Sequence, residues 1–276
     1  MNNKVMSKYL EGVENLIEER LVVFREENSI TDRNTLPDTG LYPLADHHWL
    51  KISDVICLFV DIRNSTGLSA SNHEKSTASV YELFTGTAVR MFHQLGARYI
   101  DIKGDGVFAL FNKNQAHRAF VSAVTFKTFA QENFLPLIKE KLNGAVEIGF
   151  HMGIDQKTVL VKQIGIRDSE GRDSRKNEVW AGKPINMAAK LAARSVDKEL
   201  LVSDRYYNNL SKDMRIQQTC GCTTTSSNSH EVVNVWSLRD FSEEEIFDFD
   251  SAYSMCNVWC SVHGKEWAEN ILALDN

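Results

Sequence analysis

Near the start of the chain, apolar residues recur at three- and four-residue steps, with Glu and Arg between them. This period is typical of an amphipathic helix. It predicts a helix over residues 7–27, with apolar positions at Leu10, Val13, Leu16, Ile17, Leu21 and Phe24. Two interpretations of the apolar face stay open: the helix packs on its own domain, or it is a dimerising or docking helix.

Residues 29–46 contain Pro37 and Pro43 and are typical of a loop. Strand and helix patterns alternate after them. Apolar runs predict strands over 55–60, 98–102 and 107–111, and the last two form a hairpin. Helical periodicity covers 74–95, 115–131, 185–194 and 204–210. A second hairpin is expected over 145–153 and 158–164, and short strands over 200–202 and 232–237.

The first of these elements run strand–helix–strand–strand–helix–strand, which predicts a ferredoxin-like α+β fold. Composition changes at both ends of this region. We therefore expect an N-terminal helix and loop over 1–48, the α+β domain over 49–240 and a C-terminal extension over 241–276. The extension is rich in acidic and aromatic residues and is expected to be an appended helical segment.

Bulk composition excludes several classes of function. The net charge of −6 is not that of a chain that follows a nucleic-acid backbone. The polar N-terminus lacks a signal peptide, and no apolar run reaches the ~18 residues of a membrane span. We therefore expect a cytoplasmic protein without direct membrane insertion.

Five cysteines are too few and too irregular for a secreted disulfide framework. Cys220 and Cys222 form a C-x-C pair, and Cys256 and Cys260 form a C-x₃-C pair. This combination differs from the usual spacing of structural zinc ligands, so a zinc site is not expected.

Two acidic positions carry the candidate chemistry. Asp61 and Asp105 each follow an apolar strand pattern. Two carboxylates that a sheet brings together make a hard oxygen site suited to Mg²⁺ or Mn²⁺. Paired metal sites of this kind are typical of enzymes that attack nucleotide phosphates. The alternative is that both residues serve only as turn or cap residues.

Four segments in order then resemble a known family. They are Leu58-Phe-Val-Asp-Ile62, Lys103-Gly-Asp-Gly-Val107, Val146-Glu-Ile-Gly-Phe-His-Met-Gly153 and Gly182-Lys-Pro-Ile-Asn-Met-Ala-Ala-Lys190. Together they resemble the motifs of class III nucleotidyl cyclases, the adenylate and guanylate cyclase catalytic domain, over residues 55–210. The resemblance implies a metal-dependent cyclase that joins the ribose 3′-hydroxyl of a nucleoside triphosphate to its α-phosphate and releases pyrophosphate.

The resemblance also assigns roles to the metal and phosphate residues. Asp61, Asp105 and the Ile62 carbonyl would hold two divalent ions, Mn²⁺ or Mg²⁺. The triphosphate would lie against Asn64, Ser65 and Thr66, because free backbone N–H groups at a helix start attract phosphate. The family's triphosphate-binding lysine before the last strand has no evident counterpart here, and Arg63 would replace it. Lys103 has three open roles: it contacts phosphate, steadies Asp101, or forms a structural ion pair.

Two further groups of residues follow from the family's motifs. Asn186 would orient the ribose, and Lys190 stands where the family has an arginine that stabilises the transition state. Lysine offers a point charge rather than a planar fork, so Arg194, one turn further, is an alternative source of the guanidinium. Asn186, Lys190 and Arg194 are therefore the candidate catalytic residues.

The base-selecting positions are Asp101 and Val179, where adenylate cyclases have a lysine and an aspartate. A different alignment moves the second position to Glu178. Asp101 accepts hydrogen bonds but donates none, so it cannot pair with adenine N1, whereas it can meet uracil N3–H or cytosine N4–H₂. This pattern resembles the bacterial Pycsar pyrimidine cyclases of antiphage defence, and UTP is the expected substrate.

The resemblance implies partners as well. In the family, metal residues and base or transition-state residues come from different protomers, which predicts a homodimer with shared active sites. A separate cyclic-nucleotide effector would read the product. Four alternatives stay open: cyclisation of CTP, cyclisation of ATP, a degenerate nucleotide-binding module, and a phosphodiesterase or polymerase-like use of a similar sheet.

Overall fold

A computed structural model of the chain describes residues 2–38, 42–43, 45–71, 74–144, 146–167, 173–222 and 232–275. The strands are β1 (Ser29–Arg33), β2 (His48–Arg63), β3 (Tyr99–Lys103), β4 (Gly106–Phe111), β5 (Gly149–Arg167), β6 (Asp173–Gly182), β7 (Leu200–Ser203), β8 (Ser237–Asp240) and β9 (Ser251–Met255). The helices are α1 (Asn2–Arg25), α2 (Ser65–Ser71), α3 (Glu74–Gln94), α4 (Ala116–Phe129), α5 (Leu135–Lys141), α6 (Lys183–Arg194), α7 (Asp204–Tyr207), α8 (Met214–Gln217) and α9 (Gly264–Leu272). Single helical turns lie at η1 (Lys113–Gln115), η2 (Ala130–Phe134) and η3 (Ala273–Asp275).

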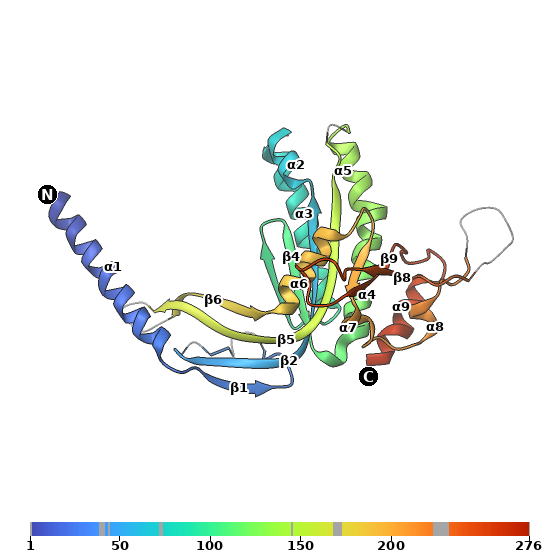
Figure 1. Cartoon of the computed structure of the whole chain (residues 1–276). Helices are drawn as coiled ribbons and strands as arrows, with labels where there is room; N and C mark the ends of the chain where they lie inside the picture. Colours follow the sequence, from blue (N-terminus) through green and yellow to red (C-terminus); the bar gives the residue numbers. More distant parts are fainter. Residues whose placement is uncertain are drawn as a thin grey trace.

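The strands form one mixed sheet in the order β3-β4-β2-β5-β7-β9-β8, with β1 beside β2 and β6 beside β5. The first four strands in this order pair antiparallel with one another and are connected as β2-α3-β3-β4-α4-β5. This is the ferredoxin-like order that the sequence predicts. The prediction of the α+β fold is therefore confirmed (Figure 1).

Alternate residues of β2 enter two different cores, as the two-residue period of a strand requires. Ile56 and Leu58 are fully buried in a cluster with side chains of α3 and α4. Val55 and Cys57 are fully buried in a second cluster, which includes Ala188 of α6. From Val55 onward, the odd-numbered positions of β2 therefore lie on the face of the sheet that α6 partly covers.

One predicted hairpin is wrong. Residues 149–167 form a single long strand, β5, which pairs with β2 on one side and with β6 on the other. The polar residues that suggest a turn are held inside the ladder, where Asp155 lies opposite Cys57. The buried Asp155 carboxylate is neutralised by Arg205, with Nη2 2.5 Å from Oδ2. A long-range ion pair thus keeps a polar stretch in the strand.

The long strands leave the domain as an arm, with α1 at its far end (Figure 1). The pairing of β2 with β5 shifts register between Ile52 and Val55, and Asp54 adopts a positive φ of 53° there. Such a bulge bends a strand and increases its twist. An exposed ion pair lies at the bend, where Lys113 Nζ is 2.7 Å from Asp54 Oδ2.

The amphipathic N-terminal helix is confirmed as α1, but its apolar face is not buried. Its apolar positions are 49–84% exposed, at Leu10, Val13, Leu16, Ile17, Leu21 and Phe24. The interpretation that this face packs on its own domain is therefore wrong, and a dimerising or docking role stays a prediction. Arg20 and Asp46 form an exposed ion pair between α1 and the segment before β2. Of the helices described, none has the length and apolar character needed to cross a bilayer.

The prediction for the C-terminal region needs two corrections. Residues 241–276 contain a helix, α9, but also β9, which pairs antiparallel with β7 in the main sheet. The strand expected over 232–237 begins only at Ser237, as β8. Contacts with α4 explain how this region is held, because Lys127 Nζ donates to the Met255 carbonyl at 2.7 Å. The Asp275 carboxylate also accepts hydrogen bonds from the backbone N–H groups at the start of α4.

Candidate active site

The sheet brings the two candidate metal carboxylates together. Asp61 lies near the end of β2, and Asp105 lies in the turn between β3 and β4; Val60 of β2 pairs with Val107 of β4. The approach is so close that a Cβ added to Gly106 would lie 3.1 Å from Asp61 Oδ1. Glycine at this position therefore lets the turn pass beside the carboxylate.

The electrostatics of this carboxylate pair favour a bound cation. Burial and the neighbouring Asp105 carboxylate raise the pKa of Asp61 to about 7, although the Ile62 N–H acts in the opposite direction. Asp105 Oδ2 is buried and has no hydrogen-bond partner among the described residues. An unpaired buried carboxylate oxygen beside a second carboxylate fits a divalent metal ion, which prefers such ligands. Asp61, Asp105 and the adjacent Ile62 carbonyl are therefore suited to hold one.

His151, which belongs to the third family motif but has no role assigned by it, lies on the strand beside Asp61. It stands directly opposite Asp61 in the pairing of β2 with β5. Burial and the nearby Arg63 guanidinium lower its pKa. His151 Nδ1 lies 3.5 Å from Ser195 Oγ, just beyond α6. Only the register of two strands distant in sequence reveals this neighbour.

The predicted phosphate-binding stretch begins the short helix α2. Asn64 has a positive φ of 65°, and its carbonyl accepts a hydrogen bond from the Leu68 N–H at 3.1 Å. Its side chain donates to the Glu147 carbonyl at 3.0 Å, which ties the turn to the segment before β5. Ser65 and Thr66 form the first turn of α2, as the sequence predicts for a helix start. Phosphate binding by these residues and Arg63 stays a prediction.

Asp101 and Lys103 form an ion pair on β3. Lys103 Nζ lies 2.6 Å from Asp101 Oδ2, and the Ile102 N–H donates to Asp101 Oδ1 at 2.8 Å. This contact fits two of the three roles left open for Lys103, steadying Asp101 and forming a structural ion pair, and the choice between them stays a prediction. The Asp101 side chain keeps 28% of its surface exposed, so it remains accessible to a ligand.

The second base-selecting position differs between the two possible alignments. Glu178 accepts hydrogen bonds from Tyr99 at 3.2 Å and from Gln163 at 2.9 Å. Val179, the next residue of β6, points to the opposite face of the strand and is 37% exposed. Tyr99 lies two residues before Asp101 on β3, so Glu178 is on the same side of the sheet as Asp101. The geometry favours Glu178 as the base-selecting residue beside Asp101. A base-selecting role for Val179 stays a prediction.

The three candidate catalytic residues lie on α6. Asn186 is exposed near its start. Lys190 Nζ donates to the Ile246 carbonyl at 2.8 Å, and Arg194 pairs with Glu244 at 2.8 Å. Both cations are thus held by the segment between β8 and β9. Within the described residues, no hydrogen bond or ion pair joins Asn186, Lys190 or Arg194 to the Asp61–Asp105 pair.

Comparison with solved structures identifies the fold. A class III adenylyl cyclase-like ATP-binding protein from Pseudomonas aeruginosa matches 79% of this chain and 47% of its own, with a TM-score of 0.55 and 16% identity. The adenylyl cyclase CyaB from P. aeruginosa matches 76% of this chain and 96% of its own, with a TM-score of 0.53 and 15% identity. No protein-family model matches the sequence.

Proteins related in sequence carry a named activity. A uridylate cyclase from Micromonospora echinofusca is 30% identical over 247 residues, which are 88% of this chain and 77% of the relative. A uridylate cyclase from Propioniciclava tarda is 33% identical over 227 residues, 82% of this chain and 70% of the relative. The chain belongs to the class III nucleotidyl cyclase family. This nucleotidyl cyclase carries its acidic pair at the end of β2 and at the turn between β3 and β4, as the motif resemblance implies.

Proposed function

We propose that this nucleotidyl cyclase converts UTP to 3′,5′-cyclic UMP and pyrophosphate. The observation that carries the proposal is the Asp61–Asp105 pair, in which a buried carboxylate oxygen lacks a partner among the described residues. The names of the two relatives at 30% and 33% identity support uridylate as the product. An intact acidic pair argues against the alternative of a degenerate nucleotide-binding module.

The reaction forms one bond and breaks another at the α-phosphorus. The ribose 3′-oxygen attacks this atom, the 3′-hydroxyl proton is lost, and the bond to the β-phosphate oxygen breaks with release of pyrophosphate. When bound, divalent ions such as Mn²⁺ or Mg²⁺ would lower the pKa of the 3′-hydroxyl and neutralise charge on the leaving pyrophosphate. Asp61, Asp105 and the Ile62 carbonyl would hold these ions. Arg63 and the start of α2 would face the β- and γ-phosphates.

Base selection rests on Asp101 in this proposal. Its carboxylate accepts a hydrogen bond from uracil N3–H, and Lys103, 2.6 Å away, supplies a donor for an adjacent carbonyl. Glu178 adds a second carboxylate on the same side of the sheet. Placing adenine N1 against a carboxylate would leave two acceptors facing each other, at a cost of ~1–3 kcal/mol. CTP is the second candidate, because cytosine N4–H₂ also donates.

The active molecule in this proposal is a homodimer with two shared sites. One chain holds the acidic pair, while Asn186 and Lys190 on α6 make no hydrogen bond or ion pair with it among the described residues. A second copy would place its own Asn186, Lys190 and Asp101 against the first chain's acidic pair. The exposed apolar face of α1 is available for such an association. A role in bacterial antiphage signalling, with a separate effector that reads cyclic UMP, belongs to the proposal and rests on the Pycsar resemblance alone.

The test is incubation of the full chain with Mn²⁺ and each of the four nucleoside triphosphates in turn, with products identified by mass spectrometry. We expect cyclic UMP from UTP. Turnover of ATP alone would contradict the role of Asp101. Failure to cyclise any nucleotide with Mn²⁺ or Mg²⁺ would favour the degenerate module. The Asp105→Asn chain serves as the blank.

A further inference from the structure

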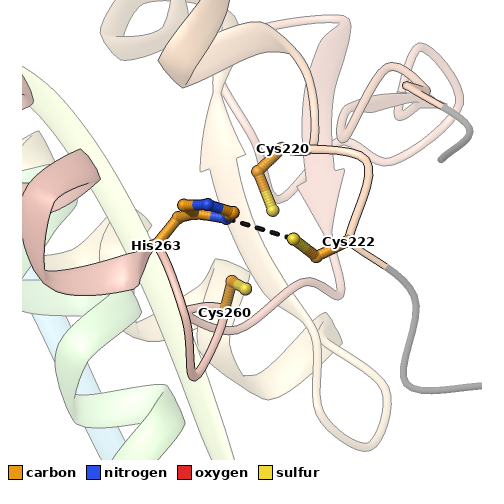
Figure 2. A group of neighbouring side chains, drawn as sticks. All are labelled: Cys220, Cys222, Cys260 and His263. Carbon is orange, nitrogen blue, oxygen red and sulfur yellow. Dashed lines mark hydrogen bonds between the residues drawn. The ribbon is translucent and has the colours of Figure 1, made fainter.

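A cluster of sulfur and imidazole ligands lies outside the nucleotide site. Cys220 and Cys222 follow α8, whereas Cys260 and His263 precede α9. One ligand atom from each of the four residues lies within 4.8 Å of all the others. Figure 2 shows the three thiols and the imidazole ring around one common point. Segments far apart in sequence therefore converge on a site that could hold one ion.

Local backbone structure explains how each pair of ligands converges. Gly221 between the two cysteines has a φ of +77°, a conformation that side chains rarely adopt. This turn lets Cys220 and Cys222 face the same point. On the other side, the Val262 N–H donates to Cys260 Sγ at 3.4 Å. The first turn of α9 holds His263, whose carbonyl accepts from the Trp267 N–H at 2.9 Å.

We propose that Cys220, Cys222, Cys260 and His263 bind one Zn²⁺ ion as a structural site. Three thiolates and one imidazole are a usual zinc ligand set, and all four tetrahedral positions come from the protein. Bond lengths in such a site place neighbouring ligand atoms about 3.6–3.8 Å apart. The expected spacing lies within the range of distances between ligand atoms in the cluster. All of these distances are at most 4.8 Å, and that between Cys222 Sγ and His263 Nδ1 is 3.1 Å.

The zinc ligands differ from the pairs that the cysteine spacing suggests. Cys256 is exposed and lies outside the cluster, and His263 takes the fourth position instead. The sequence contains a Cys-x₂-His pair at 260–263. This pair is far from Cys222 in the chain, and its spacing does not show that the two segments meet. Sequence spacing alone therefore gives no reason to expect the site.

The position of the site gives the ion a mechanical role. It would join the segment after α8 to the segment before α9, at the edge of a cavity of about 410 Å³. Two tryptophans also bind the same region to neighbouring helices. Trp259 Nε1 donates to Thr125 Oγ1 of α4 at 2.9 Å. Trp267 Nε1 donates to the Arg215 carbonyl of α8 at 2.7 Å. Zinc would thus stabilise the packing of the C-terminal region on α4 and α8.

The test is the zinc content of the full-length chain, purified under reducing, oxygen-free conditions and measured by mass spectrometry of the metal. We expect about one ion per chain. Cys222→Ser and His263→Asn chains should retain less than about one tenth of that amount. Cys256→Ser is the matched control, because it removes a cysteine four residues from Cys260 and should keep the full content.

Cobalt substitution keeps the test decisive if the ligand variants fail to fold. Wild-type chain reconstituted with Co²⁺ should show the visible absorption of a tetrahedral thiolate site, and Zn²⁺ should abolish it. Absence of both zinc and the cobalt spectrum in folded wild-type chain would overturn the proposal. So would a disulfide between two of the three cysteines in the reduced preparation, or equal zinc in the His263→Asn and wild-type chains. None of these readouts depends on nucleotide turnover.

Discussion

The acidic pair and the thiol cluster contrast in both chemistry and completeness. Asp61 and Asp105 offer hard oxygen ligands, and the pair leaves one buried oxygen without a partner among the described residues. Cys220, Cys222, Cys260 and His263 offer soft sulfur and nitrogen ligands, enough to fill a tetrahedral site. An incomplete oxygen site suits a metal that must also bind phosphate, whereas a complete sulfur site suits a metal that only stabilises structure.

The two regions also differ in how the chain builds them. The acidic pair lies on neighbouring strands of one sheet, at a strand end and a hairpin turn. The thiol cluster lies on loops next to two short helices and joins regions on either side of β8 and β9. Changes at the first region should therefore alter turnover, and changes at the second should alter stability.

The largest expected effect is on catalysis at the acidic pair. Asp61→Ala should lower cyclic UMP formation by at least about a thousandfold, because several kcal/mol of metal stabilisation are lost. The measurement is product formation by mass spectrometry with Mn²⁺. The variant should keep the wild-type zinc content. Wild-type activity in this variant would remove the metal role of Asp61.

Mixed dimers test whether the acidic pair works with the α6 residues of a second chain. Asp105→Ala and Asn186→Ala chains should each be inactive alone. Random pairing makes half of the dimers mixed, each with one of two sites intact, so a refolded equal mixture should recover about one quarter of wild-type activity. Activity assays before and after mixing measure the recovery. If the mixture stays inactive, the shared-site arrangement is wrong.

Base selection should change by a smaller factor. Asp101→Asn introduces a donor at an acceptor position and should reduce the preference for UTP over ATP by about tenfold. The measurement is the ratio of kcat/KM for the two nucleotides. Glu178→Gln should reduce the preference as well, and Val179→Ala should not. The reverse result would favour the alignment that assigns the second position to Val179.

The last expected effect is on stability rather than on turnover, and it concerns the C-terminal region. Burial lowers the pKa of Lys127 to about 7, whereas the amine in the unfolded chain keeps its usual pKa of about 10.4. The unfolded chain binds more protons between these values, so the free energy of unfolding rises with pH across this window. Lys127→Met should therefore raise Tm most near about pH 7, by an amount equivalent to about 1–4 kcal/mol.

Thermal melts at about pH 7 and about pH 10 check this expectation, because the gain should shrink at the higher pH. Lys139→Met, at an exposed lysine of α5, is the control and should change Tm little at either pH. A Lys127→Met chain that is less stable at about pH 7 would show that the hydrogen bond to Met255 outweighs the cost of burying the ammonium. Cyclase activity should stay unchanged in both variants.

The sequence alone determined the elements of the ferredoxin-like core and the positions of Asp61 at a strand end and Asp105 in a hairpin turn. Both follow from local signals, because apolar periodicity sets each element and a tight Gly-Asp-Gly turn sets the hairpin. The exposed α1 face, the unbroken β5 and the Glu178–Tyr99 contact were decided only by tertiary structure. So was the convergence of His263 with three cysteines. Each depends on residues far apart in the chain, whose pairing no local pattern encodes, such as the Arg205–Asp155 ion pair that keeps polar residues within β5.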